Sequence, residues 1–130
     1  MLKTPYYGEA RLRARRIGLD MISWARVLEL RDEVGSEDFD EVVELFLEEV
    51  EDVLDRLKQG ASENDLANDM HFLKGSAMSL GFQGFSNKCR DAERLSAEGQ
   101  PNAVDLPGIF QEYEQSKAQF VAELPGHIAG

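Results

Sequence analysis

The chain has 130 residues, 42% of them apolar, which is enough for the core of one folded domain. Its 14 Lys and Arg residues stand against 25 Asp and Glu residues, for a formal net charge of −11. So acidic a chain lacks the basic surface with which nucleic-acid binders displace counterions from phosphates. The single cysteine, Cys89, allows no internal disulfide, and no apolar run is long enough to span a membrane. We expect a cytoplasmic protein with no membrane or nucleic-acid partner.

Positive charge gathers at the N-terminus. Residues 1–16 carry +4, so the rest of the chain carries −15. We predict that residues 1–19 form a basic N-terminal extension, that residues 20–124 form the folded domain, and that residues 125–130 form a C-terminal tail. Two interpretations of the extension stay open: a frayed or vector-derived terminus, or a basic arm that helps to recruit an acidic partner.

From residue 20 onward, apolar residues recur at helical spacing, and no useful length alternates with the two-residue period of a strand. The pattern predicts five helices, over residues 20–34, 37–59, 62–80, 85–98 and 107–124. Asp20, Ser36 and Ser62 are the predicted helix starts, because such side chains cap free backbone N–H groups. Gly81 suits the left-handed position after a helix. The sequence therefore predicts an all-α fold: an antiparallel four-helix bundle with a short additional N-terminal helix.

The helix at 62–80 has two contrasting faces. At about 100° per residue, its apolar side chains cluster on one core face: Leu66, Met70, Leu73, Ala77 and Leu80. His71 lies about 140° from the centre of that face, so we predict that its side chain points into solvent. The only other histidine, His127, falls in the predicted tail and is assigned no role.

The outward face around His71 contains no carboxylate, although the chain is acidic. Its members are Asn64, Ala67, Asn68, Lys74, Gly75 and Met78. Gly75, one turn after His71, costs about 1 kcal/mol relative to Ala in a helix interior. Steric clearance beside the imidazole is the simplest reason for that glycine, because residues four apart are neighbours on a helix. A packing or kink glycine is the alternative.

The stretch His71-Phe72-Leu73-Lys74-Gly75-Ser76-Ala77, followed by Leu80-Gly81, resembles a family signature. That signature, His-x-Leu-Lys-Gly-Ser-Ala/Ser with an aliphatic–Gly pair that closes the helix, belongs to histidine-containing phosphotransfer domains. The resemblance covers roughly residues 20–122. Phe72 occupies a variable position that more often holds a small or polar residue, and the basic extension lies outside the match.

The resemblance implies a phosphorelay intermediate, whose exposed histidine accepts a phosphoryl group from the phospho-aspartate of one receiver domain and passes it to another. His71 would be the acceptor, Lys74 would stabilise the phosphoryl oxygens, and Gly75 would leave room for the group. A docking surface would include Ala67, Asn68, Phe72 and Met78. The implied partners are response-regulator receiver domains and a hybrid or sensor histidine kinase. The chain would act as a monomer without a cofactor, since the receiver supplies Mg²⁺.

Other functions find less support in the sequence. No Gly-rich phosphate cradle or Walker motif is present, so we expect a phosphocarrier and not a kinase. His71 has no second histidine three or four residues away to share a metal. A passive helical adaptor, which binds a receiver or kinase without transfer and does not need His71, is the alternative. Two separate alternatives also stay open: Lys74 as an ordinary solubilising lysine, and Phe72 and Met78 as boundary residues without a docking role.

Overall fold

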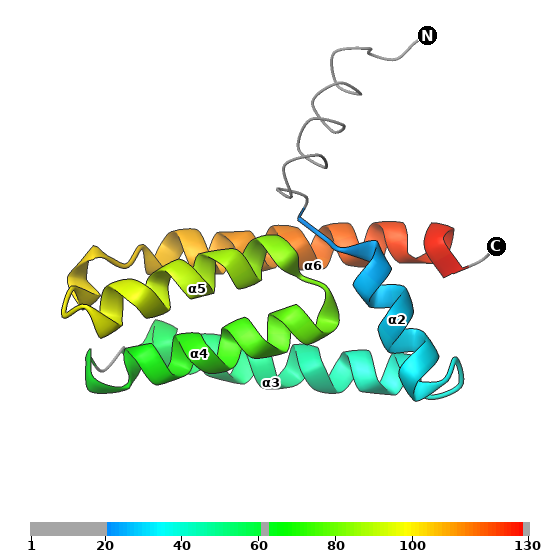
Figure 1. The fold of residues 1–130 in the computed structure, drawn as a ribbon, viewed down its shortest axis with the longest axis horizontal. Helices are drawn as coiled ribbons and strands as arrows, with labels where there is room; N and C mark the ends of the chain where they lie inside the picture. The colour runs from blue at the N-terminus through cyan, green and yellow to red at the C-terminus, as the bar shows by residue number, and fades with distance from the viewer. Residues whose placement is uncertain (1–20, 61–62, 129–130) are drawn as a thin grey trace, which may run out of the picture.

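A computed structural model describes residues 21–60 and 63–128, and within these ranges the chain is helical with no strand. Four long helices make up the bundle: α3 (Phe39–Gln59), α4 (Glu63–Leu80), α5 (Gln83–Ala97) and α6 (Leu106–Ile128). They run antiparallel in chain order, and α2 (Trp24–Val34) lies across one end of the bundle (Figure 1). A short 3₁₀ helix, η1 (Pro101–Ala103), precedes α6. The predicted all-α bundle with an additional leading helix is confirmed. The predicted basic extension at 1–19 and the caps Asp20 and Ser62 lie outside the described residues.

The predicted core face of α4 is confirmed. Its five members are all 3% exposed or less: Leu66, Met70, Leu73, Ala77 and Leu80. They pack into one cluster with buried apolar side chains of the other helices. Cys89 of α5 is also buried there, and burial raises the pKa of its thiol to about 12. Since this stripe of α4 fills the core, the opposite face of the helix is available for contacts with solvent and with other molecules.

The turn between α4 and α5 depends on Gly81. Its φ of 94° lies in the left-handed region that favours glycine, as the sequence predicts for this position. The N–H of Phe82 donates to the carbonyl of Ala77 at 2.8 Å, and the N–H of Gly81 donates to that of Met78 at 3.3 Å. A Cβ on Gly81 would also lie 2.8 Å from Val27 Cγ2 of α2. The glycine therefore both ends α4 and lets α2 approach.

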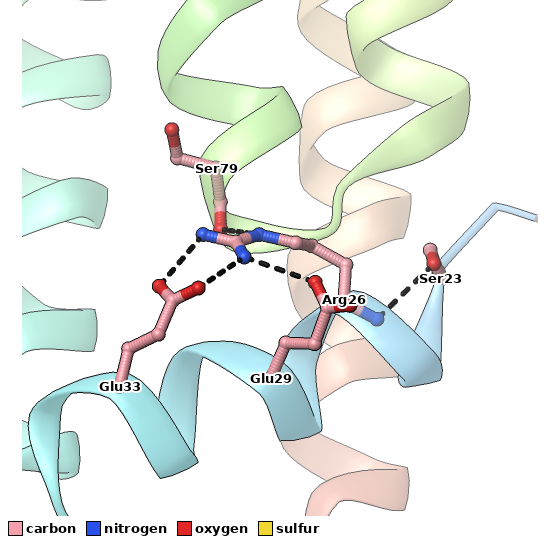
Figure 2. Close-up of polar contacts among 5 residues, drawn as sticks. All are labelled: Ser23, Arg26, Glu29, Glu33 and Ser79. Carbon is pink, nitrogen blue, oxygen red and sulfur yellow. Dashed lines mark hydrogen bonds and ion pairs between the residues drawn. The ribbon is translucent and has the colours of Figure 1, made fainter.

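Arg26 fastens α2 to the end of α4 (Figure 2). Its Nε donates to the carbonyl oxygen of Ser79 at 2.9 Å, and its guanidinium also pairs with Glu29 and Glu33 at 3.1 Å. The carbonyls of the last helical turn have no partner within the helix, so an arginine is well suited to them. Ser23 caps α2 by accepting from the N–H of Arg26.

Several helix ends differ from the predicted ones. Helix α2 begins at Trp24 after its Ser23 cap, α3 begins at Phe39 two residues later than predicted, and α5 begins at Gln83 two residues earlier. The predicted C-terminal tail at 125–130 is wrong for residues 125–128, because α6 continues through Pro125 to Ile128. His127 in this last turn stacks on Trp24 of α2 at 3.9 Å between ring centroids. That contact holds the turn in place although Pro125 lacks an N–H.

Helix α6 is joined to α3 by a polar contact at the edge of the core. The buried Tyr113 donates its hydroxyl to Glu51 Oε2 at 2.6 Å, and Lys117 Nζ donates to the same oxygen at 2.6 Å. Burial raises the pKa of Glu51, but the hydrogen bonds from Lys117 and Tyr113 outweigh it and hold that pKa below its ordinary value. Glu51 is therefore a carboxylate that holds two helices together.

Replacing Tyr113 with phenylalanine should lower the free energy of unfolding by about 1 kcal/mol, because one hydrogen bond to a carboxylate is lost. Glu51 has a lowered folded pKa, so its contribution is present above the unfolded value of about 4.3 and is lost as the pH falls through the folded one. Urea denaturation at pH 7 and at about pH 3 measures both effects. Equal stability of the two proteins at pH 7 would contradict the assignment, whereas a difference that shrinks in acid supports it.

Candidate functional site

His71 faces outward from α4, as the helical periodicity predicts. Its neighbour Met70 is fully buried in the core, whereas the His71 side chain is 69% exposed. Helix α5 runs antiparallel to α4 (Figure 1), and of the described helix pairs these two have the most extensive contact. The imidazole is therefore accessible to a partner and also within reach of side chains from α5.

Glu93 of α5 reaches the imidazole, which the sequence analysis did not anticipate. One carboxylate oxygen, Oε2, lies 2.9 Å from His71 Nδ1, and the other, Oε1, lies 2.7 Å from Lys74 Nζ. The hydrogen bond from Lys74 lowers the pKa of Glu93, and the bond with His71 adds to that effect against the opposing effect of burial. The predicted absence of carboxylates is confirmed for the residues that α4 itself contributes to this face. It is wrong for the face as a whole, because Glu93 of α5 lies beside His71.

A signal for this contact was present in the sequence. His71 and Glu93 each lie eleven residues from Phe82, which lies in the turn between the two helices. In an antiparallel helix pair, residues equally far from the turn lie at about the same level along the bundle. Glu93 also flanks Ala92 on the buried stripe of α5, so it stands at the margin facing α4.

Lys74 lies one turn after His71 and is only partly exposed. Its ammonium pairs with Glu93, and its side chain retains 24% of its full exposure. Its backbone carbonyl accepts a hydrogen bond from the buried Ser86 hydroxyl at 3.1 Å. Lys74 is thus tied to α5 at both its side chain and its backbone, which differs from an ordinary surface lysine with a free side chain.

Gly75 has no structural requirement to be glycine. Its φ is not positive, and among the described residues a Cβ built on it would meet nothing within 4 Å outside its own helical turn. The alternative interpretation of Gly75 as a packing glycine therefore loses its basis. A glycine here costs about 1 kcal/mol relative to Ala, and none of the described residues accounts for it.

The predicted docking residues surround His71 on the surface of α4. Asn68 is exposed, Ala67 is partly buried, and the two apolar side chains stand out: Phe72 is 41% exposed and Met78 is 60% exposed. Asp69, the nearest carboxylate on α4, is directed toward α3, where Arg56 binds it with two hydrogen bonds of 2.8 and 3.0 Å. The α4 surface around His71 thus combines apolar and neutral polar groups.

A groove of about 310 Å³ continues this surface beyond Met78. It lies where α2 meets the α4–α5 turn, and its lining includes Ser23, Arg26, Met78, Ser86 and Asn87. Met78 therefore lies both on the surface beside His71 and in the lining of this groove.

Within the described ranges, no group of three His, Cys, Asp or Glu side chains is placed to hold a metal ion. The helices described here also include none that is long and apolar enough to cross a membrane. The site consists of the exposed imidazole of His71, which contacts the carboxylate of Glu93. Lys74 pairs with the same carboxylate, and the described residues leave open space beside Gly75, one turn after His71.

A comparison with protein families gives a match over most of the chain. The family model described as "Hpt domain" matches residues 41–128, which include α4, α5, α6 and nearly all of α3. No curated protein and no solved structure matched the chain.

Proposed function

The chain belongs to the Hpt domain family, and from this premise we propose that His71 accepts a phosphoryl group from the phospho-aspartate of one receiver domain and passes it to another. Hpt domains are phosphocarrier modules of two-component signalling, without kinase activity, that interact with receiver domains and kinases. The observation that carries the proposal is the exposed imidazole of His71 on the outward face of α4, inside the matched range.

The transfer needs only a nucleophile and room for the phosphoryl group. A ring nitrogen of His71 attacks the phosphorus, the bond from phosphorus to the aspartyl oxygen breaks, and the electron pair leaves with the partner's carboxylate. The transition state is loose and spreads charge over the three equatorial oxygens. In our proposal the receiver domain contributes Mg²⁺ and the aspartate pocket, while this chain contributes the imidazole and the open space above Gly75.

We propose that the receiver docks on the surface formed by Ala67, Asn68, Phe72 and Met78. Exposed aromatic and methionine side chains of this kind are enriched in protein interfaces. A receiver and a hybrid or sensor histidine kinase remain the expected partners. One copy of the chain supplies every residue of the site, so a monomer suffices for transfer.

Lys74 is proposed to stabilise the phosphoryl oxygens in the transition state. Replacing Lys74 with alanine should slow transfer about tenfold, less than the loss of a donor in an enclosed site, because solvent reduces the electrostatic effect here. Rapid-quench transfer from a labelled receiver measures the rate constant. Lys88→Ala, which removes an exposed lysine of α5, serves as the charge-matched control. Equal rates in both variants would make Lys74 a bystander.

The proposal is tested by offering the chain phosphorylated receiver domains with Mg²⁺ and analysing the bound phosphate. A phosphoramidate on histidine is labile in acid and stable in alkali, which distinguishes it from an acyl phosphate or a phosphate ester. Transfer of such a label to the chain, followed by its return to a second receiver, is the expected result. A helical adaptor would instead bind the receivers and remain unlabelled.

A further inference from the structure

Two exposed arginines of α5, Arg90 and Arg94, flank the site. Two other residues of this helix contact α4: the Ser86 hydroxyl donates to the Lys74 carbonyl, and Glu93 pairs with the Lys74 ammonium. Arg90 lies four residues after Ser86 and three before Glu93, so helical geometry places it on the edge of α5 that borders α4. Arg94 follows one turn later and faces further outward. Both arginines therefore lie on the side of the bundle where the imidazole is exposed.

These two arginines do not fasten α5 to another helix. Arg26 and Arg56, which join α2 and α3 to α4, make short hydrogen bonds, of 2.9 Å from Arg26 Nε and 2.8 Å from Arg56 Nη2. Among the described residues, Arg90 and Arg94 pair only with Asp91 of their own helix, at 3.5 and 3.7 Å. Their side chains are 61% and 62% exposed. Most of their N–H donors are therefore available to another molecule.

Helix α5 is the only α-helix of the described ranges with a positive net charge. It has three Lys or Arg residues and two Asp or Glu residues, whereas α3 has two and eight, for net charges of +1 and −6. The other three α-helices described are also negative. Helix α5 packs against α4 and α6, and α3 packs against α4 and α2, so α4 separates the positive helix from the most negative one (Figure 1). A chain of net charge −11 thus places its positive helix beside the exposed imidazole.

We propose that Arg90 and Arg94 bind the acidic rim of the receiver's phospho-aspartate pocket and so speed the association of the two proteins. This inference rests on the proposed function of His71, which makes a receiver the partner. Mg²⁺ offsets only part of the negative charge of the phosphoryl group and of the carboxylates that hold the ion, so the pocket stays negative. Guanidinium groups pair well with carboxylates, and opposite charges on two partners accelerate their encounter. The pair extends onto α5 the docking surface proposed on α4.

A purely structural role for the arginines predicts different behaviour. Arg94 lies in the last turn of α5, where a cation interacts favourably with the helix dipole. That role does not account for Arg90, which lies in the middle of the helix. Stabilisation of the helix would change the thermal midpoint of the isolated chain and leave its encounter with a receiver unaffected. A docking role instead changes the association rate, in a manner that depends on salt.

Stopped-flow association with receiver domains tests the proposal. The receivers are loaded with Mg²⁺ and beryllofluoride, which mimics the phosphoryl group on aspartate but is not transferred. Arg90→Gln and Arg94→Gln should each slow association about threefold at low ionic strength, and by much less at about 0.5 M salt, which screens the charges. Lys88→Gln is the matched control, because Lys88 is an exposed cation of α5 that lies beside Gly108 and Ile109 of α6. It should associate at nearly the parental rate.

Asp91→Asn tests the sign of the effect. Asp91 is the carboxylate that pairs with both arginines, so its removal leaves their charge less compensated. We expect this variant to associate about twofold faster than the parent at low ionic strength. If the arginine variants and Asp91→Asn all associate at the parental rate at every salt concentration, the proposal is wrong. An arginine effect that is equally large in Lys88→Gln would also overturn it, since total charge and not position would then matter.

Transfer kinetics separate docking from chemistry. The double variant of Arg90→Gln and Arg94→Gln should need more phosphorylated receiver to reach half of its maximal transfer rate, while that maximal rate stays near the parental one. A lower maximal rate with unchanged association would place the arginines in the reaction itself and refute the docking role. A receiver that associates with the expected salt dependence but transfers no phosphate would support the docking surface and refute the proposed function of His71. If no receiver associates with the parent, both proposals fail.

Discussion

Replacing His71 with glutamine should abolish the acid-labile label that the chain takes from a phosphorylated receiver. Glutamine keeps a polar side chain on the outward face of α4, but its amide has no nucleophilic electron pair comparable to that of the imidazole. The exposed position makes the change nearly neutral for folding, within about 0.5 kcal/mol. Loss of the label should therefore occur in a chain with unchanged helix content and thermal unfolding.

The chain supplies its own control for this result. His127→Gln makes the same chemical change at the only other histidine, which stacks on Trp24 at the far end of α6. We expect this variant to accept phosphate at the parental rate, although its thermal midpoint should fall slightly because the stack is weakened. Label that persists in His71→Gln would show that phosphate enters elsewhere. Binding of receivers by both variants without any label in the parent would favour the adaptor function.

Substitution of Gly75 should change stability and transfer in opposite directions. Alanine has no steric conflict here, since a Cβ meets nothing within 4 Å, and it favours the helix by about 1 kcal/mol. Glutamine should also stabilise the helix, but its longer side chain lies beside His71, one turn away, and occupies the space of the incoming group. We therefore expect Gly75→Gln to unfold at a higher denaturant concentration and to transfer phosphate at least tenfold more slowly, an effect of about 1.4 kcal/mol on the barrier.

The two measurements are denaturant unfolding and rapid-quench transfer on the same protein samples. Gly126→Gln is the matched control, because Gly126 also lies in a helix with nothing within 4 Å of a Cβ, and it is on α6. That control should leave transfer unchanged. If Gly75→Gln transfers at the parental rate, the open space beside His71 has no role in catalysis. If it unfolds more easily than the parent, the glycine serves the helix instead.

Local features of this protein follow closely from its sequence. The three-to-four spacing of Leu66, Met70, Leu73 and Ala77 places one side of α4 in the core, and the same geometry turns His71 outward. Gly81 ends α4 at the predicted residue, because only glycine readily takes the left-handed conformation that the turn needs. In such cases the structure depends only on a few residues that lie close together in the sequence.

The end of α6 shows the limit of local rules. Pro125 and Gly126 both disfavour a helix, which is why the sequence predicts a tail from residue 125. His127 stacks on Trp24, a residue near the other end of the sequence, and this contact compensates for the weak local preference for a helix. Similarly, the bond from Arg26 to the Ser79 carbonyl joins α2 to α4 across 53 residues. Neither contact can be read from the propensities of the residues around it.

The sequence by itself determined the fold class, the outward histidine and the family signature around it, since each depends on the periodicity or identity of residues close together on one helix. Only the tertiary structure decided what faces the histidine. Glu93 meets His71 because α4 and α5 pack antiparallel, with rotations that bring these two side chains to the same edge. Those rotations result from the packing of the whole core. The chain has a net charge of −11 but no carboxylate on the outward face of α4 itself. The carboxylate beside His71 and Lys74 is that of Glu93, which comes from α5.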